Sequence, residues 1–332
     1  MAVRLKDVAL RAGVSVRTVS NVVHEFRHVA PATRARVQAA LDELGYRPNT
    51  AARQLRGGRT GLVALVIPEL DSPYFSELAA RLTDEAEQRG WTLLVDQTRG
   101  DPERELRLLR ADGRHHVDGV IFSPWGVDPG ALDPQTLHVP MVVLGEQVPA
   151  GMLDHVAVDS VAAGADATRH LLSTGRERVA AIGAQPHRSN ATAAMRLAGY
   201  RAALDEVAAE YVAARVADVR TLHRDDGAAA MRRLLDQAPD LDAVFCFTDE
   251  LALGALRTLH RGGIKVPDDV ALLGIDDIED GRFSTPSLST IAPDKQALAA
   301  RAVELLDDRL GDPGAEARTE TIAHALVVRE SS

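Results

Sequence analysis

The sequence contains very little cysteine and few aromatic residues. Cys246 is the single cysteine among 332 residues, which excludes an internal disulfide framework. Aromatic residues make up 4% of the chain, so we expect a core built mainly from Ala, Val and Leu. No apolar run approaches the roughly 18–20 residues that cross a membrane, and the first residues, MAVRLKDVALRAG, carry charges where a secretory signal would be apolar. These absences favour a cytoplasmic protein.

Common enzyme and metal motifs are also absent. The sequence has no P-loop, no G-x-G-x-x-G and no G-x-S-x-G. Its histidines form no H-E-x-x-H, its one cysteine lacks metal-ligand spacing, and the acidic run DDIED at 276–280 lacks the ligand pattern of an EF-hand loop. We therefore predict no catalytic residues, no cofactor and no metal, and we expect that the protein is not an enzyme.

Charge is distributed unevenly along the chain. The formal net charge is −10, yet residues 1–60 contain 11 Lys and Arg against four Asp and Glu, which is +7 and leaves −17 for the rest. A basic N-terminal segment on an acidic body indicates that the segment alone meets a polyanion such as DNA.

The N-terminal segment has the pattern of three short helices. Apolar residues recur at helical spacing in LKDVALRA (5–12), VRTVSNVVH (16–24) and ATRARVQAALDELG (32–45), with Val16, Val19, Val22 and Val23 expected on one side of the second run. Gly13 stands where a chain leaving a helix often needs positive φ, and Ser15 can cap the next helix. Two short helices joined in this way, completed by a third, are typical of a helix-turn-helix unit.

The second of these helices is the predicted reader of the DNA major groove. Arg17 has the fork geometry for guanine O6 and N7, and Asn21 can pair with adenine N6 and N7. Thr18 and Ser20 are more suited to phosphate contacts, which set the register without reading the sequence.

A short basic segment follows at residues 47–60. Asn49 can cap a helix running to about residue 56, but eight residues are too few to hold a helix in water alone. We therefore expect a hinge that orders on DNA.

The segment from Leu5 to Leu55 resembles the DNA-binding region of the LacI/GalR (lactose repressor) family of bacterial regulators. The matching signature is DVA, AGVS, TVS, VxxxTRxxVxxAxxELGYxPN and the hinge AxxL. The resemblance implies that Leu55 inserts into the minor groove and kinks the duplex. Two departures, Asn21 in place of a frequent Arg and His24-Glu25 in place of Asn-Gly, leave the operator sequence open. Our candidate DNA contacts are Lys6, Ser15, Val16, Arg17, Thr18, Ser20, Asn21, His24, His28, Thr33, Asn49, Ala52, Leu55 and Arg56.

From Gly61 onward, short apolar runs alternate with amphipathic helices. GLVALVIP, DGVIFSP, MVVLG, RVAAIG, AVFCFTDE and VALLGIDD read as buried strands, and this rhythm is typical of parallel sheets. Ligands of such folds gather beyond the carboxyl ends of the strands. The residues there include hydroxyls, carboxylates and several of the few aromatic side chains, which suits a small polyhydroxylated or heterocyclic ligand.

The resemblance extends over the body through RLAGY, DELALGALR, VPDDVALLGIDDIE and PSLSTI. It implies an N-terminal helix-turn-helix head (1–46), a hinge (47–60) and an α/β body (61–330) like the periplasmic sugar-binding proteins, with two parallel-sheet subdomains. We place the first subdomain at about 61–159 plus 291–318 and the second at about 160–290 plus 319–330. It also implies an effector in the cleft, held best by Arg196 and Asp276. Our further candidates are Tyr74, Phe75, Phe122, Trp125, Thr192 and Thr248.

These features together predict a DNA-binding transcription regulator, a repressor, which binds a pseudo-palindromic operator as a homodimer and is controlled by a sugar or related metabolite. Gly145 and Thr248 stand where sugar-binding members often have Asp and Asn, so a simple hexose is not assigned. The chain ends soon after ALVVRE without a heptad tail, which favours a dimer over a tetramer. Control by a partner protein and a solute-binding receptor remain alternatives.

Overall fold

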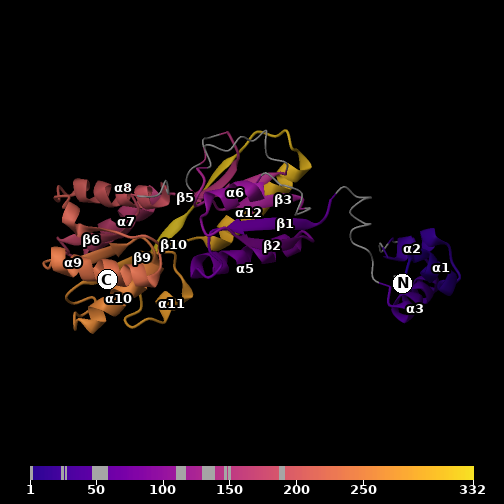
Figure 1. The fold of residues 1–332 in the computed structure, drawn as a ribbon, viewed down its shortest axis with the longest axis horizontal. Coiled ribbons are helices and arrows are strands. Elements are labelled where there is room, and N and C mark those ends of the chain that lie inside the picture. The colour runs from indigo at the N-terminus through magenta and orange to yellow at the C-terminus, as the bar shows by residue number, and fades with distance from the viewer. Residues whose placement is uncertain are drawn as a thin grey trace. The chain divides into compact units, whose positions relative to one another are not determined.

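The computed structural model describes residues 3–23, 26, 28–46, 59–109, 117–128, 139–145, 148, 151–186 and 191–332. The chain divides into two compact units, residues 1–60 and 61–332. The first unit contains three helices, α1 (Leu5–Ala12), α2 (Val16–Val23) and α3 (Pro31–Leu44). The second contains two six-stranded sheets and the helices that cover them (Figure 1).

The three helices of the first unit pack around a small apolar core. Val8 and Ala12 of α1, Val19 of α2 and Val37 of α3 are all buried in it. Gly13 ends α1 at φ 65° and Gly45 ends α3 at φ 61°, the left-handed backbone that glycine adopts without steric cost. The predicted helices, the role of Gly13 and the end of the third helix at Gly45 are confirmed.

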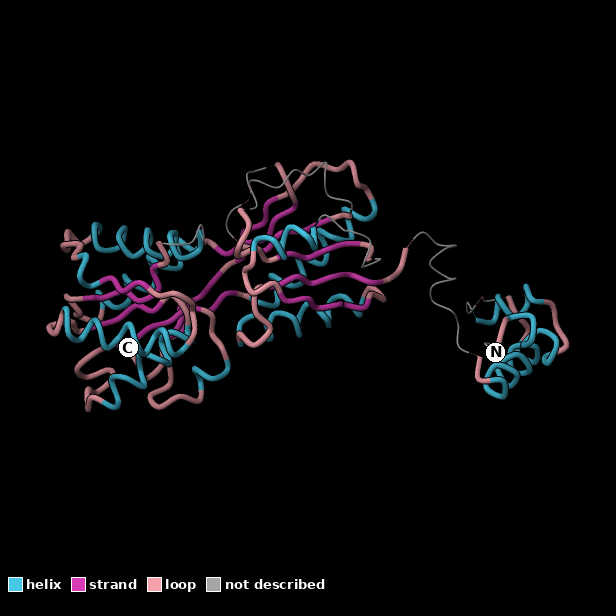
Figure 2. The backbone as a smooth tube through the Cα atoms, in the orientation of Figure 1, coloured by secondary structure: helices cyan, strands magenta, loops and turns pink. Residues whose placement is uncertain are grey.

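The central strands of each sheet are buried on both faces, as expected for parallel strands between helices, whereas an edge strand such as Thr92–Gln97 is partly exposed. Figure 2 shows the strands with helices around them. The first sheet has the order β11 (Thr319–Ile322), β5 (Asp154–Val158), β4 (Met141–Leu144), β3 (Gly119–Phe122), β1 (Leu62–Ile67) and β2 (Thr92–Gln97). The second has the order β12 (His324–Val327), β10 (Ser289–Pro293), β9 (Ala271–Ile275), β8 (Ala243–Cys246), β6 (Val179–Ala184) and β7 (Val216–Asp218). Every pairing is parallel except that of β12 with β10.

The helices cover both sheets. For the first sheet they are α5 (Pro73–Gln88), α6 (Pro102–Leu109) and α12 (Lys295–Gly311), and for the second α7 (Ser160–Ser173), α8 (Ala191–Glu206), α9 (Arg224–Gln237) and α10 (Asp249–Arg261), with the short η3 (Ala213–Arg215) and α11 (Glu279–Arg282). Leu82 of α5 and Leu306 of α12 lie in one core with Leu65 of β1. Helix α7 packs closely against α8, and α9 packs closely against α10. Gly164 and Gly254 permit this, because they have no side chain and leave room for the backbone of the neighbouring helix.

The chain crosses between the two sheets three times, at residues 158–160, 293–295 and 322–324. The boundaries drawn from the sequence need two corrections. Residues 291–293 belong to the second subdomain, because β10 pairs with β9 up to Ile291 and with β12 up to Pro293. Residues 319–322 belong to the first, because β11 pairs with β5. Strand pairing, which the local pattern does not encode, decides both.

Candidate functional site

Helix α2 carries five of the predicted DNA contacts, namely Val16, Arg17, Thr18, Ser20 and Asn21. Arg17 is exposed, while Thr18, Ser20 and Asn21 are half-buried around it. In the described part of the chain Arg17 forms no ion pair or hydrogen bond, so its guanidinium is available to a partner. Val16 does not join the core as its spacing had predicted; it is 46% exposed at the start of α2.

Ser15 caps α2 as predicted. Its Oγ accepts a hydrogen bond from the backbone N–H of Thr18 at 3.0 Å and lies 2.9 Å from Thr18 Oγ1. Capping satisfies one of the unpaired N–H groups at the helix start and fixes the direction of α2.

The remaining DNA candidates are distributed over the head and the hinge. Lys6 and His28 are exposed and Thr33 is half-buried. Five further candidates lie outside the described residues, namely His24, Asn49, Ala52, Leu55 and Arg56.

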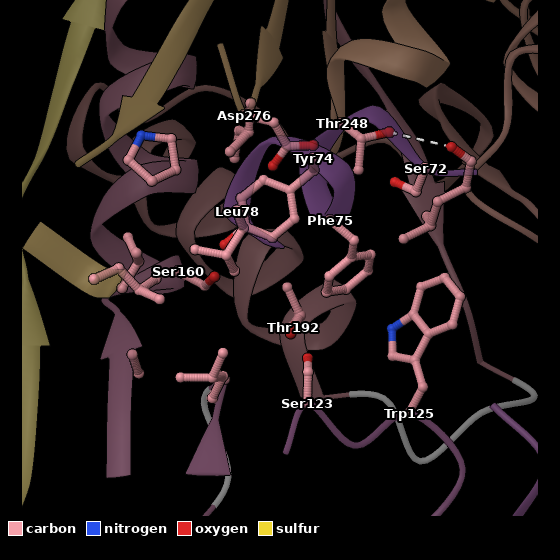
Figure 3. Close-up of a pocket in the computed structure, with 18 of the residues that line it drawn as sticks. Ser72, Tyr74, Phe75, Leu78, Ser123, Trp125, Ser160, Thr192, Thr248 and Asp276 are labelled. Carbon is pink, nitrogen blue, oxygen red and sulfur yellow. Dashed lines mark hydrogen bonds between the residues drawn. The ribbon is translucent and has the colours of Figure 1, made fainter. Parts of the chain in front are cut away.

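The second unit contains a cavity lined by residues from both sheets and their helices. Tyr74 and Phe75 of α5 line one side, and Thr192 of α8 and Asp276 after β9 line others (Figure 3). Its volume is about 150 Å³. The site lies where the carboxyl ends of parallel strands present their loops, as the sequence had predicted.

Three aromatic rings form a continuous wall of this cavity. The Tyr74 and Phe75 ring centroids are 5.2 Å apart, and those of Phe75 and Trp125 are 6.4 Å apart, both in edge-to-face arrangements. Such rings offer flat apolar faces to a ligand ring.

Arg196 and Asp276 meet at the cavity, as their proposed role requires. Arg196 Nη2 lies 3.9 Å from Asp276 Oδ1, and Arg196 Nη1 donates to the carbonyl of Phe247. Asp276 is 6% exposed and has a φ of 120°, an unusual backbone for a residue with a side chain. Burial raises the pKa of Asp276 to about 7, although Arg196 and Lys295 oppose the shift.

Thr248 serves as a helix cap and also lines the cavity. Its Oγ1 accepts a hydrogen bond from Leu251 N at 3.2 Å and donates to Leu222 O at 3.4 Å (Figure 3). The hydroxyls of Ser72, Ser123 and Ser160 line the same space.

The structure does not place Phe122 at the ligand site, contrary to the prediction from the sequence. It is fully buried in a core with Val66, Met141 and Val143, and it is not among the residues that line the cavity. Side chains alternate along a strand, so the end of β3 directs Phe122 into the sheet's core, while Ser123 and Trp125 follow it at the cavity.

Three acidic residues of the lining were not selected from the sequence: Glu69, Asp128 and Glu250. Glu69 lies just after β1, and His223 Nε2 is 3.2 Å from Glu69 Oε2 and its Nδ1 3.9 Å from Glu250 Oε2. Burial raises the pKa of Glu250, while His223 and Arg224 oppose the shift. The one sequence feature that indicates a place for Glu69 in the ligand site is its position just after a buried strand.

Two fully buried carboxylates position the loops around the cavity. Glu105 of α6 accepts backbone hydrogen bonds from Trp125, Gly126 and Val127 at 2.8–3.1 Å. Asp249 accepts from Ile278 N at 3.0 Å and from Thr290 Oγ1 at 2.7 Å, which supports the loop after β9. Gly274 makes the second arrangement possible, because a Cβ there would lie 2.2 Å from Asp249 Oδ1.

Within the described ranges, no group of three or more His, Cys, Asp or Glu side chains is placed to hold a metal ion. Among those same residues, no helix has the length and apolar character required to span a bilayer.

A helix-turn-helix head and a body with a cavity define a DNA-binding protein of the ligand-responsive class. Residues 4–49 match the family described as bacterial regulatory proteins, lacI family, and residues 168–332 match the periplasmic binding protein-like domain. The HTH-type transcriptional regulator CelR of Thermobifida fusca is 36% identical over 98% of this chain and 97% of its own length. The chain therefore belongs to the LacI family of transcription regulators.

Two solved structures agree with this assignment over nearly the whole chain. A transcriptional regulator CelR–cellobiose complex has a TM-score of 0.74 and 34% identity, covering 99% of this chain and 100% of its own. A lac repressor dimer bound to operator and the anti-inducer ONPF has a TM-score of 0.88 and 26% identity, covering 100% and 99%. The predicted fold class, a helical head and an α/β body with two parallel-sheet subdomains, is confirmed.

Proposed function

We propose that this regulator represses transcription as a homodimer on a pseudo-palindromic operator and that a small sugar or related metabolite in its cavity changes its affinity for DNA. The single observation that carries the proposal is the pairing of two features in one chain. One is an exposed, uncommitted Arg17 on a capped helix, and the other is a cavity with a buried Arg196–Asp276 pair. The lac repressor dimer on its operator and the cellobiose-bound CelR supply the precedent.

In the head, α2 acts as the recognition helix. Arg17 and Asn21 read base edges, while Thr18 and Ser20 contact phosphates and fix the register. The hinge candidates Asn49, Ala52, Leu55 and Arg56 lie outside the described residues, and we propose that Leu55 kinks the duplex at the operator centre.

In the body, Arg196 and Asp276 provide directed hydrogen bonds to ligand hydroxyls. Tyr74, Phe75 and Trp125 provide the apolar faces, and Thr192 and Thr248 add hydroxyl contacts. A ligand that binds one arrangement of the two subdomains more tightly shifts the equilibrium between them, and a coupling of a few kcal/mol changes operator occupancy by about 10- to 100-fold. The protein works by binding and carries out no reaction, in the cytoplasm where chromosomal DNA is found.

The test of the head is a binding-site selection with full-length Arg17→Ala. We expect relaxed base preference at one position in each half-site and a loss of about 1–3 kcal/mol in binding to the preferred site. Lys6→Ala is the matched control for a phosphate contact, with similar losses on all sequences. Uniform weakening by Arg17→Ala would make Arg17 a phosphate contact instead.

The test of the body is a thermal-shift screen of sugars, nucleosides and purines. A specific ligand raises the melting temperature with concentration. Asp276→Asn and Arg196→Met should each abolish the shift, and a shift that both variants retain would place the ligand elsewhere.

A further inference from the structure

The cavity is unusually rich in carboxylates. Its described lining includes Glu69, Asp128, Glu250 and Asp276, against the single guanidinium of Arg196. With all four carboxylates ionised, the lining carries a net charge of three negative units. Anions entering a partly buried site of this sign are repelled more strongly than in open water, because the low dielectric of the protein screens them poorly.

The guanidinium of Arg196 is partly engaged. Arg196 Nη1 donates to the Phe247 carbonyl and Nη2 lies 3.9 Å from Asp276 Oδ1, while the buried Nε has no hydrogen-bond partner in the described structure. A phosphate at this guanidinium would lie beside the buried Asp276 carboxylate, and the like charge would oppose its binding.

The cations next to the cavity are committed as well. Lys295 Nζ bonds Glu77 Oε2 at 2.5 Å and the carbonyl of Asp277 at 3.0 Å, and Arg224 Nη2 bonds Asp280 Oδ2 at 3.0 Å. Among the described residues, these contacts leave Arg196 as the one guanidinium of the cavity lining.

What the cavity does offer suits hydroxyl groups. Carboxylate oxygens accept hydrogen bonds from hydroxyls, and the hydroxyls of Ser72, Ser123 and Thr248 can donate or accept. Three aromatic rings in edge-to-face arrangement add apolar surface. The Tyr74 ring already has a cation–π partner, because Lys295 Nζ lies 5.9 Å from the ring centroid.

We propose that the cavity selects an uncharged, hydroxyl-rich ring and rejects the phosphorylated or carboxylated counterpart of the same molecule. This inference rests on the proposed function of the cavity as the effector site. It narrows the proposed sugar or related metabolite to a neutral saccharide, and the groups that discriminate against anions are Glu69, Asp128 and Glu250.

The sign of the charge in the cavity can be measured without knowing the ligand. Trp125 lines the cavity, and Trp91 is the only other tryptophan, so Trp91→Phe makes Trp125 the single indole reporter. The experiment measures how strongly caesium, iodide and neutral acrylamide each quench the fluorescence of the Trp91→Phe variant, at pH 8 and matched ionic strength. Asp276 is largely ionised at that pH, since its pKa is about 7.

We expect caesium to quench Trp125 about three- to tenfold better than iodide, after correction with acrylamide and with free tryptophan as reference. The triple variant Glu69→Gln, Asp128→Asn, Glu250→Gln should bring the ratio close to that of free tryptophan. A control triple, Glu210→Gln, Asp236→Asn, Glu316→Gln, removes the same charge from exposed positions outside the lining and should retain the preference. Equal or better quenching by iodide in the parent would overturn the proposal.

The second measurement is calorimetric binding of matched pairs to the full-length protein: cellobiose with cellobionate, and glucose with glucose 6-phosphate and glucosamine. A neutral sugar should bind at least about 100-fold more tightly than its anionic partner, and the lining triple should reduce that ratio. Tighter binding of an anionic partner than of the neutral sugar, or of glucose 6-phosphate than of the cationic glucosamine, would overturn the proposal. If no sugar binds while caesium still quenches preferentially, the proposed sugar effector fails and the measured sign of the cavity stands.

Discussion

At the residue scale, environment rather than residue type determines what each carboxyl group does. Asp276, Glu105 and Asp249 are all buried carboxyl groups. Asp276 faces the cavity beside Arg196, while the other two accept backbone hydrogen bonds and hold loops. The sequence identified Asp276 through its place after a strand, but Glu105 lies inside a helix pattern that gives no sign of its partners.

Asp276 should make the stability of the body depend on pH. In the folded protein its pKa is about 7, whereas in the unfolded chain it is about 3.9. The folded state therefore keeps a proton that the unfolded state loses, so this stabilising contribution is present at low pH and is lost as the pH rises from about 4 through 7. We expect the free energy of unfolding of the parent, relative to Asp276→Asn, to fall by about 2 kcal/mol between pH 5 and pH 8.

Urea denaturation followed by tryptophan fluorescence measures this difference, because both tryptophans lie in the body. The exposed Asp236→Asn provides the baseline for removing one carboxylate. A parent-minus-variant difference that stays constant across this range would show that Asp276 titrates at an ordinary pKa.

Glu105→Gln should loosen the loop that presents Trp125. The side-chain amide retains one acceptor for three backbone N–H groups and introduces donors that face them, which costs about 2 kcal/mol of stability. Trp125 emission should shift to longer wavelength as the indole becomes more hydrated. Glu103→Gln on the same helix is the control, since its side chain is 87% exposed, and the prediction fails if both variants behave alike.

At the scale of elements, the loop after β1 and the loop before α9 meet at His223. Its ring lies 3.2 Å from Glu69 of the first subdomain and 3.9 Å from Glu250 of the second. Arg224 also approaches Glu250, at 3.7 Å. The imidazole attracts both carboxylates when it is protonated, so it connects the two subdomains beside the cavity.

A double-mutant cycle of Glu69→Gln and His223→Gln tests this contact. We expect a coupling free energy of about 0.5 kcal/mol, a modest value because the His223 side chain is 37% exposed. Additive effects of the two substitutions would mean that the two side chains do not interact. Asp225→Asn, on the exposed start of α9, replaces Glu69→Gln in the control cycle.

The elements themselves were predictable to different degrees. Buried runs such as LVALVI and AVFC and the helices of the head follow directly from apolar spacing. The strands β5, β10 and β11 were not identified, because they are short and their sequences DHVAV, STIAP and TETI mix polar with apolar residues. Their partners stabilise them, and each lies next to a crossing between the sheets, which explains why the subdomain boundaries were displaced.

At the scale of the whole molecule, the opposite charges of the two units predict separate tasks. Deleting residues 1–60 removes a net charge of +7 and should leave a folded body that binds ligand and has no affinity for the operator. The full-length protein should show a steep loss of operator affinity with salt, because phosphate contacts release counterions. Gel-shift titrations at several salt concentrations, with circular dichroism of the truncated chain, test both parts. Specific operator binding by residues 61–332 would contradict the assignment of the head.

The sequence by itself determined the helix-turn-helix head, the alternation of strands and helices, and the family, because these depend on local spacing and on short motifs. Only the tertiary structure decided which strand ends share a cavity. It removed Phe122 from the site, brought Glu69 and Glu250 to it and assigned Glu105 to a loop. The reason is that side-chain direction at a strand end and contact between residues far apart in the chain depend on sheet order and on the crossings, and no local pattern records either.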